Sequence, residues 1–162
     1  MDAKIDESWF VKPEGISQRL SSGGVVCRVQ DGQVLVAVAR ERDLQEYVLP
    51  KGGVEEGESL EEASAREIQE ETGLADLVRL GKVGVCQRLA YNKEMWVTTH
   101  LYLYYTTQIE GVPTDQEYHD GVWWLEIGDL AALFWPEQRR LIEENADEIV
   151  AKIKDYHRRL AE

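Results

Sequence analysis

The sequence predicts an α/β or α+β fold class, with a mixed β-sheet between helices. Three observations support this: valine-rich runs near the N-terminus, a helix with both capping signals, and further extended segments followed by a second helical region. Elements in this order bury their apolar faces readily as a sheet with helices on both faces. A chain of 162 residues with 43% hydrophobic content suits one domain with a core and is too short for two ordinary ones. Residues 1–162 are therefore expected to form a single domain.

The first two strands are expected after a polar arm of residues 1–15. Residues 23–29 and 34–39 are rich in valine, which favours strands because its branched β-carbon packs well on a pleated surface. Asp31 and Gly32 lie between the two runs, and Asp-Gly is typical of a two-residue type I′ turn. The two strands are therefore expected to pair antiparallel.

The central helix is predicted over residues 60–72. Ser59 and Glu62 have the spacing of a capping box, in which each side chain accepts a hydrogen bond from the other residue's backbone N–H. Gly73 lies where a left-handed residue commonly ends a helix. Three more extended segments and then a short helix are expected to follow. The segments are 78–91, 95–107 and 122–125, and the short helix is 127–133.

A C-terminal helix is predicted over residues 136–160, with Pro136 at its first position, where a backbone N–H is not needed. Its apolar residues are spaced three and four apart, so they form one stripe. They are Ile142, Ala146, Ile149, Ile153, Tyr156 and Leu160. The stripe has two interpretations: it packs on the sheet, or it is the seam of a homodimer.

The composition limits the classes of function. A formal net charge of −13 argues against nucleic acid as a partner, because such interfaces need clustered Lys and Arg. No apolar run is long enough to cross a bilayer, and the N-terminal ten residues carry charges where a signal peptide is apolar. A cytoplasmic protein without a membrane partner is expected. Cys27 and Cys86 lie in apolar runs and are expected to be buried thiols.

Three glutamates are predicted to share one face of the central helix. Glu67, Glu70 and Glu71 stand at positions i, i+3 and i+4, and like charges at this spacing repel one another by roughly a few tenths of a kcal/mol per pair. A hard divalent cation offsets that repulsion. Carboxylate oxygens suit Mg²⁺, which keeps part of its hydration shell and completes its octahedron with phosphate oxygens. The expected cofactor is Mg²⁺, with Mn²⁺ as a substitute.

The segment from Gly52 to Leu74 resembles the Nudix box, G-x5-E-x7-R-E-U-x-E-E-x-G-U, where U is apolar. Every fixed position is matched. The matching residues are Gly52, Glu58, Arg66, Glu67, Ile68, Glu70, Glu71, Gly73 and Leu74. The resemblance implies the Nudix fold, a mixed sheet sandwiched between helices, and metal-dependent hydrolysis of a phosphoanhydride bond.

The resemblance also implies roles for individual residues. The implied metal ligands are Glu67, Glu70, Glu71 and the carbonyl oxygen of Gly52. Glu58 and Arg66 match the pair that braces the loop against the helix. The family takes its general base either from the box, where Glu67 would serve, or from a later loop, where the candidate is Glu117, six residues before Trp123. Glu117 is also a candidate metal ligand.

The residues outside the box suggest a substrate. The run Leu49-Pro50-Lys51-Gly52 is similar to the branch that acts on dinucleoside polyphosphates and diphosphoinositol polyphosphates, although that branch often has a histidine where this chain has Gly53. Lys51 is expected to bind a phosphate. The other candidates for substrate binding are Arg40, Arg42 and Tyr91. The preferred substrate is a dinucleoside polyphosphate such as diadenosine tetra- or hexaphosphate.

Three alternatives remain open at this point. Within the family these are a nucleoside triphosphate pyrophosphatase, which cleans the nucleotide pool, and an enzyme that removes pyrophosphate from RNA 5′ ends. Outside catalysis, the alternative is a nucleotide-sensing module. Such modules commonly lose carboxylates of the box, whereas all of them are present here.

Overall fold

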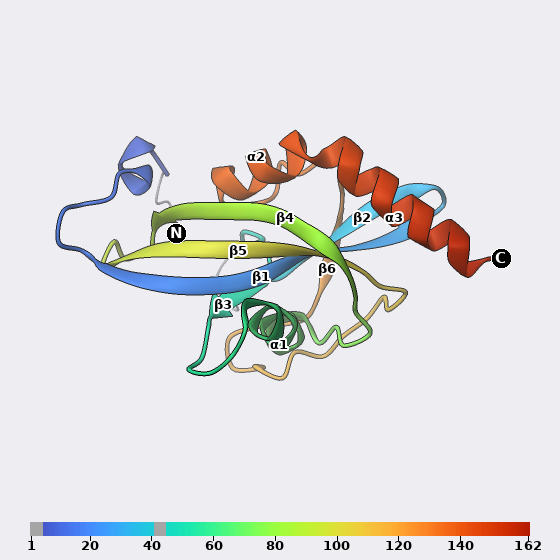
Figure 1. The fold of residues 1–162 in the computed structure, drawn as a ribbon, viewed down its shortest axis with the longest axis horizontal. Helices are drawn as coiled ribbons and strands as arrows, with labels where there is room; N and C mark the ends of the chain where they lie inside the picture. The colour runs from blue at the N-terminus through green and yellow to red at the C-terminus, as the bar shows by residue number, and fades with distance from the viewer. Residues whose placement is uncertain (1–4, 41–44) are drawn as a thin grey trace.

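The computed structural model describes residues 5–40 and 45–162, and a six-stranded mixed sheet forms its centre. Helix α1 lies on one face of the sheet, and α2 and α3 lie on the other (Figure 1). This arrangement confirms the predicted mixed sheet between helices. The elements are η1 (Glu7–Phe10), β1 (Ser17–Gln30), β2 (Gln33–Val38), β3 (Lys51–Gly53), α1 (Leu60–Thr72), β4 (Val78–Leu89), β5 (Met95–Tyr105), β6 (Trp123–Glu126), α2 (Pro136–Glu144) and α3 (Ala146–Leu160).

The hairpin between β1 and β2 forms as predicted. Asp31 and Gly32 have φ angles of 50° and 78°, the left-handed values that a type I′ turn requires at both central positions. Strand β1 starts earlier than predicted, at Ser17, because its first half has a partner far away in the chain. It pairs in parallel with β5 from Ser17 opposite Met95 to Cys27 opposite Tyr105. The sheet order is β4-β5-β1-β2-β6, and β3 pairs with β1 beside this path.

A close approach between β1 and β3 sets the position of the site. Gly23 of β1 lies opposite Lys51 of β3, and a β-carbon at Gly23 would lie 2.2 Å from the carbonyl oxygen of Pro50. Only a residue without a side chain therefore allows β3 to lie this close to β1. The preceding residue, Ser22, contacts the helix layer, since its Oγ donates to the carbonyl oxygen of Leu60 at 2.6 Å. These contacts hold both β3 and the start of α1 close to β1.

Helix α1 has the predicted bounds and the predicted caps. The side chain of Ser59 accepts from the backbone of Glu62, the side chain of Glu62 accepts from the backbone of Ser59, and Gly73 ends the helix with a φ angle of 80°. The inner face of α1 is bound to the sheet: Ser64 Oγ donates to the carbonyl oxygen of Gly23 at 2.8 Å. The helix is therefore held in a constant position relative to β1 and β3.

The C-terminal region differs from the prediction in two places. Instead of one helix over 136–160, the structure has α2 and α3, because Asn145 takes a non-helical conformation (φ −111°, ψ 9°) and its side-chain amide donates to the carbonyl oxygen of Leu141. The break lets Ile142 of α2 and Ile149 of α3 both enter the main core, so this part of the apolar stripe packs on the sheet, whereas Leu160 at its end is 55% exposed. The short helix expected at 127–133 is also wrong, since these residues form turns and a bridge.

The two cysteines are free, buried thiols, as expected. Burial raises the pKa of the Cys86 thiol to about 12, so this side chain stays protonated. None of the helices in the described residues is long and apolar enough to cross a membrane.

Candidate active site

The carboxylate of Glu67 lies directly against the backbone of β3. A β-carbon at Gly52 would lie 2.2 Å from the carboxyl carbon of Glu67, so only glycine leaves room for this side chain. Glu67 is 8% exposed. Burial raises the pKa of Glu67, a hydrogen bond from Arg66 opposes that shift, and the charge of Glu70 adds to it. Burial thus disfavours the charged form of Glu67 even though Arg66 is hydrogen-bonded to it.

Arg66 connects the loop before α1 to the helix and to β3. Its Nε donates to Glu58 Oε2 at 2.7 Å and its Nη2 donates to Glu58 Oε1 at 2.8 Å, which is a bidentate pair. Nη2 also donates to the carbonyl oxygen of Gly53 at 2.9 Å, and Nη1 donates to Glu67 at 2.8 Å. The hydrogen bonds from Arg66 are the main reason why the pKa of Glu58 is lowered to about 2. Through these contacts Arg66 braces the loop before α1 against the helix and against β3.

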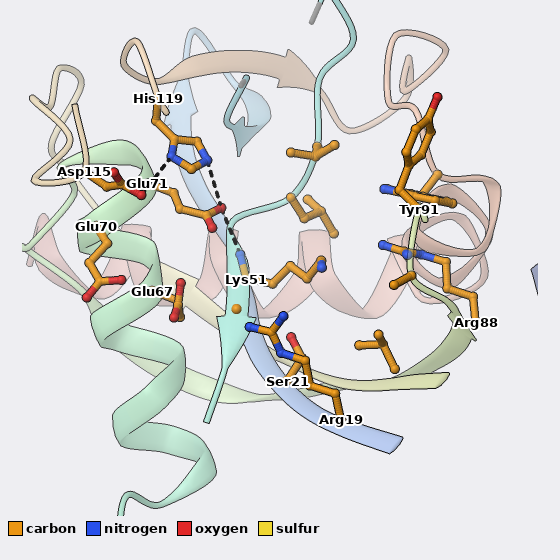
Figure 2. Close-up of a pocket in the computed structure, with 16 residues that line it drawn as sticks. Arg19, Ser21, Lys51, Glu67, Glu70, Glu71, Arg88, Tyr91, Asp115 and His119 are labelled. Carbon is orange, nitrogen blue, oxygen red and sulfur yellow. Dashed lines mark hydrogen bonds and ion pairs between the residues drawn. The ribbon is translucent and has the colours of Figure 1, made fainter. Parts of the chain in front are cut away.

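Glu71 faces the loop that precedes β6. Its Oε1 accepts from the backbone N–H of Lys51 at 3.2 Å and lies 3.8 Å from Nε2 of His119, whose Nδ1 lies 3.6 Å from Asp115 (Figure 2). His119 is buried, whereas Glu117 is exposed and is not among the residues that line the adjoining cavity. The loop therefore presents His119 and Asp115 to the cavity, and Glu117 stays a prediction.

A cavity of about 390 Å³ lies between the acidic face of α1 and a cluster of cations. Figure 2 shows Glu67, Glu70 and Glu71 on one side, with basic side chains across the cavity. The basic residues are Arg19, Lys51 and Arg88. Burial lowers the pKa of the Lys51 ammonium, and the charge of Arg88 lowers it further. Positive charge so arranged suits a ligand with several phosphate groups.

Arg88 is held in place on the cationic side. Its Nε donates to Glu137 at 2.8 Å, its Nη1 donates to the carbonyl oxygen of Leu89 at 3.0 Å, and its guanidinium lies 3.3 Å from the ring centre of Trp135. Tyr91 lies at the rim, with its ring 6.2 Å from that of Trp135. Sequence reasoning missed Arg88, because only the pairing of β4 with β5 and the packing of α2 bring it to the cavity.

Of the two arginines expected to bind substrate, the structure describes only Arg40. Arg40 pairs with Asp120 at 3.3 Å and its guanidinium lies 4.6 Å from the ring centre of Trp123, and it does not line the cavity. Arg42 lies outside the described residues. Both stay predictions.

The oxygen atoms near Gly52 are of the kind that a hard dication binds. Three carboxylates of α1 line one cavity, and Glu67 lies against a glycine backbone with no side chain between them. In the part of the chain that the structure describes, no three acidic, histidine or cysteine side chains are already gathered as a metal site. Glu67 and Glu70 instead bond Arg66, so binding an ion requires them to exchange part of these contacts.

Comparison with known proteins identifies the family. The family model of the NUDIX domain matches residues 18–144, which is most of the chain. The chain therefore belongs to the Nudix family. Together with its hydrolase relatives, this makes it a Nudix pyrophosphohydrolase.

Two relatives illustrate the range of the family. A Bacillus subtilis (strain 168) protein, provisionally named an 8-oxo-dGTP diphosphatase, is 31% identical over 138 residues, which is 83% of this chain and 88% of that protein. A Mycobacterium tuberculosis protein provisionally named mutator protein MutT4 is 33% identical over 143 residues, covering 83% of this chain and 56% of that protein.

Among solved structures, a C. elegans Ap4A hydrolase has a TM-score of 0.66 at 18% identity, covering 82% of this chain and 98% of that chain. The NUDIX domain of Shewanella oneidensis NrtR, complexed with ADP ribose, has a TM-score of 0.65 at 20% identity, covering 86% of this chain and 94% of that chain. At these identities the likeness concerns the fold alone.

Proposed function

We propose that this chain hydrolyses a phosphoanhydride bond in a dinucleoside polyphosphate, such as diadenosine tetra- or hexaphosphate, with Mg²⁺ as cofactor. The observation that carries the proposal is the cavity with the carboxylates of α1 on one side and Arg19, Lys51 and Arg88 on the other. A metal ion bound by the carboxylates and a polyphosphate bound by the cations would meet between them. A chain of several phosphates makes use of all three cations.

Each group has a part in the reaction. Glu67, Glu70, Glu71 and the Gly52 carbonyl would hold Mg²⁺, which supplies charge that polarises phosphorus and acidifies water. Lys51 and Arg88 orient the phosphates, and Tyr91 offers a ring for a base to stack on. We assign the proton acceptor to Glu67, which lines the cavity. Water adds to phosphorus, the P–O bond to the bridging oxygen breaks, and two phosphorylated products leave.

The test is product analysis over a panel of substrates. Purified protein is incubated with Mg²⁺ and dinucleoside polyphosphates, nucleoside triphosphates, ADP-ribose, diphosphoinositol polyphosphates or triphosphorylated RNA, and the products are separated by chromatography. The highest kcat/KM is expected for a dinucleoside polyphosphate. Another best substrate refutes this choice, and tight nucleotide binding without any turnover favours the sensing module.

A second candidate is hydrolysis of nucleoside triphosphates, including oxidised ones. The similarity to the Bacillus subtilis protein favours it, since that name refers to 8-oxo-dGTP. The same panel separates the two, because a triphosphate pyrophosphatase releases a monophosphate and pyrophosphate.

Three further expectations belong to this proposal. Glu117→Gln is expected to lower turnover sharply at saturating Mg²⁺, because Glu117 is proposed as a further metal ligand, and near-normal rates remove it from the site. A homodimer is tested by size-exclusion chromatography at several concentrations. A cytoplasmic location is tested by cell fractionation.

A further inference from the structure

A second cavity adjoins the first. Its volume is about 780 Å³, and it shares Arg19, Glu67 and Glu70 with the cavity described above. Its lining also includes the apolar side chains of Leu20 and Val54. Leu20 is 46% exposed, so it offers apolar surface to a ligand. The two cavities therefore meet at the carboxylates and at Arg19.

Arg19 reaches this junction because the neighbouring strand has no side chain there. A β-carbon at Gly53 would lie 2.6 Å from Nη2 and 3.0 Å from Nε of Arg19, so the guanidinium lies over Gly53. Burial raises the pKa of Glu67 and lowers that of Lys51, and the charge of Arg19 opposes the first shift and adds to the second. Figure 2 shows its guanidinium beside β3, close to Lys51.

Arg19 differs from the other arginines near the site in its bonding. Arg66 bonds Glu58, and Arg88 bonds Glu137, each at 2.8 Å or less. Within residues 5–40 and 45–162, no side-chain hydrogen bond or ion pair of Arg19 is formed. An unpaired guanidinium presents a fork of donors that matches phosphate geometry.

We propose that Arg19 binds a phosphate at the junction and thereby selects substrates that extend past the carboxylates into the second cavity. There, Leu20 and Val54 contact the second nucleoside. The inference rests on the proposed function. It names the residue that makes the enzyme prefer a two-headed substrate, which is one with a nucleoside at each end of the phosphate chain. Arg19 is thus a specificity-determining residue.

The test compares diadenosine tetraphosphate with adenosine 5′-tetraphosphate, which has as many phosphates but lacks the second nucleoside. Arg19→Ala is expected to raise KM for diadenosine tetraphosphate by ~10–100-fold, the contribution of a charge-assisted contact, with a smaller change in kcat and a smaller effect on the one-headed substrate. Arg19→Lys keeps the charge without the fork and is expected to give an intermediate KM.

A matched pair of glycine variants tests the position of the guanidinium rather than its charge. Gly53→Ala would displace Arg19 without removing it, so KM for the two-headed substrate is expected to rise. Gly128→Ala is the control, because a β-carbon there has no neighbour within 4 Å and Gly128 lines neither cavity.

The results separate this inference from the proposed function. If the wild type cleaves diadenosine tetraphosphate but Arg19→Ala leaves its KM unchanged, or raises KM equally for both substrates, the role of Arg19 is refuted and the proposed function stands. If the wild type does not cleave dinucleoside polyphosphates at all, both are refuted.

Discussion

Gly52→Ala tests whether the position of the Glu67 carboxylate controls catalysis. The added β-carbon would lie 2.2 Å from the carboxyl carbon and from Oε2 of Glu67, and 2.5 Å from Oε1. Carbon atoms in good contact are about 3.5–4.0 Å apart, so the carboxylate has to move by at least about 1.3 Å. A misplacement of about 1 Å can lower a rate ~100-fold. We therefore expect kcat to fall by about that factor.

The assay is the initial rate at saturating Mg²⁺ and substrate, with thermal unfolding followed by circular dichroism. The unfolding curve is expected to stay close to that of the wild type, because only the end of a flexible side chain is in the way. Gly128→Ala is again the control. If Gly52→Ala keeps its kcat within about threefold of the wild type, the placement of Glu67 does not control the reaction. The expectation that a displaced carboxylate lowers the rate is then refuted.

Three other predictions concern the brace, the metal and the core. Glu58→Gln is expected to cost about 1–2 kcal/mol of unfolding free energy at neutral pH, measured in urea, since the bidentate pair lies near the surface and is partly screened. Because folding lowers the pKa of Glu58 from 4.5 to about 2, its contribution is present above pH 4.5 and is lost as the pH falls through about 2, so the variant should lose less stability in that window. Chelation with EDTA should abolish turnover and added Mg²⁺ should restore it. Turnover that persists in EDTA would contradict the proposed dependence on a metal ion. Ile68→Ala, at a fully buried position, should lower stability by about 2–5 kcal/mol in calorimetry, and a smaller loss would show that the core closes around the gap.

The sequence alone determined the local parts of the fold. The Asp31-Gly32 turn and the helix from Leu60 to Thr72 have the predicted form, because their signals act over two to four neighbouring residues. The spacing of the box glutamates was equally visible, since helix geometry places i, i+3 and i+4 on one face. The break at Asn145 was not visible in the sequence, because the apolar stripe continues through it.

Only the tertiary structure decided what faces these glutamates. Arg19 on β1 and Arg88 on β4 reach the cavity through the pairing of both strands with β5, and His119 arrives from a loop far along the chain. No local pattern marks such residues, because their roles depend on contacts between segments widely separated in sequence. The sequence thus determined the acidic face of α1, whereas the packing of the sheet determined the surface opposite it.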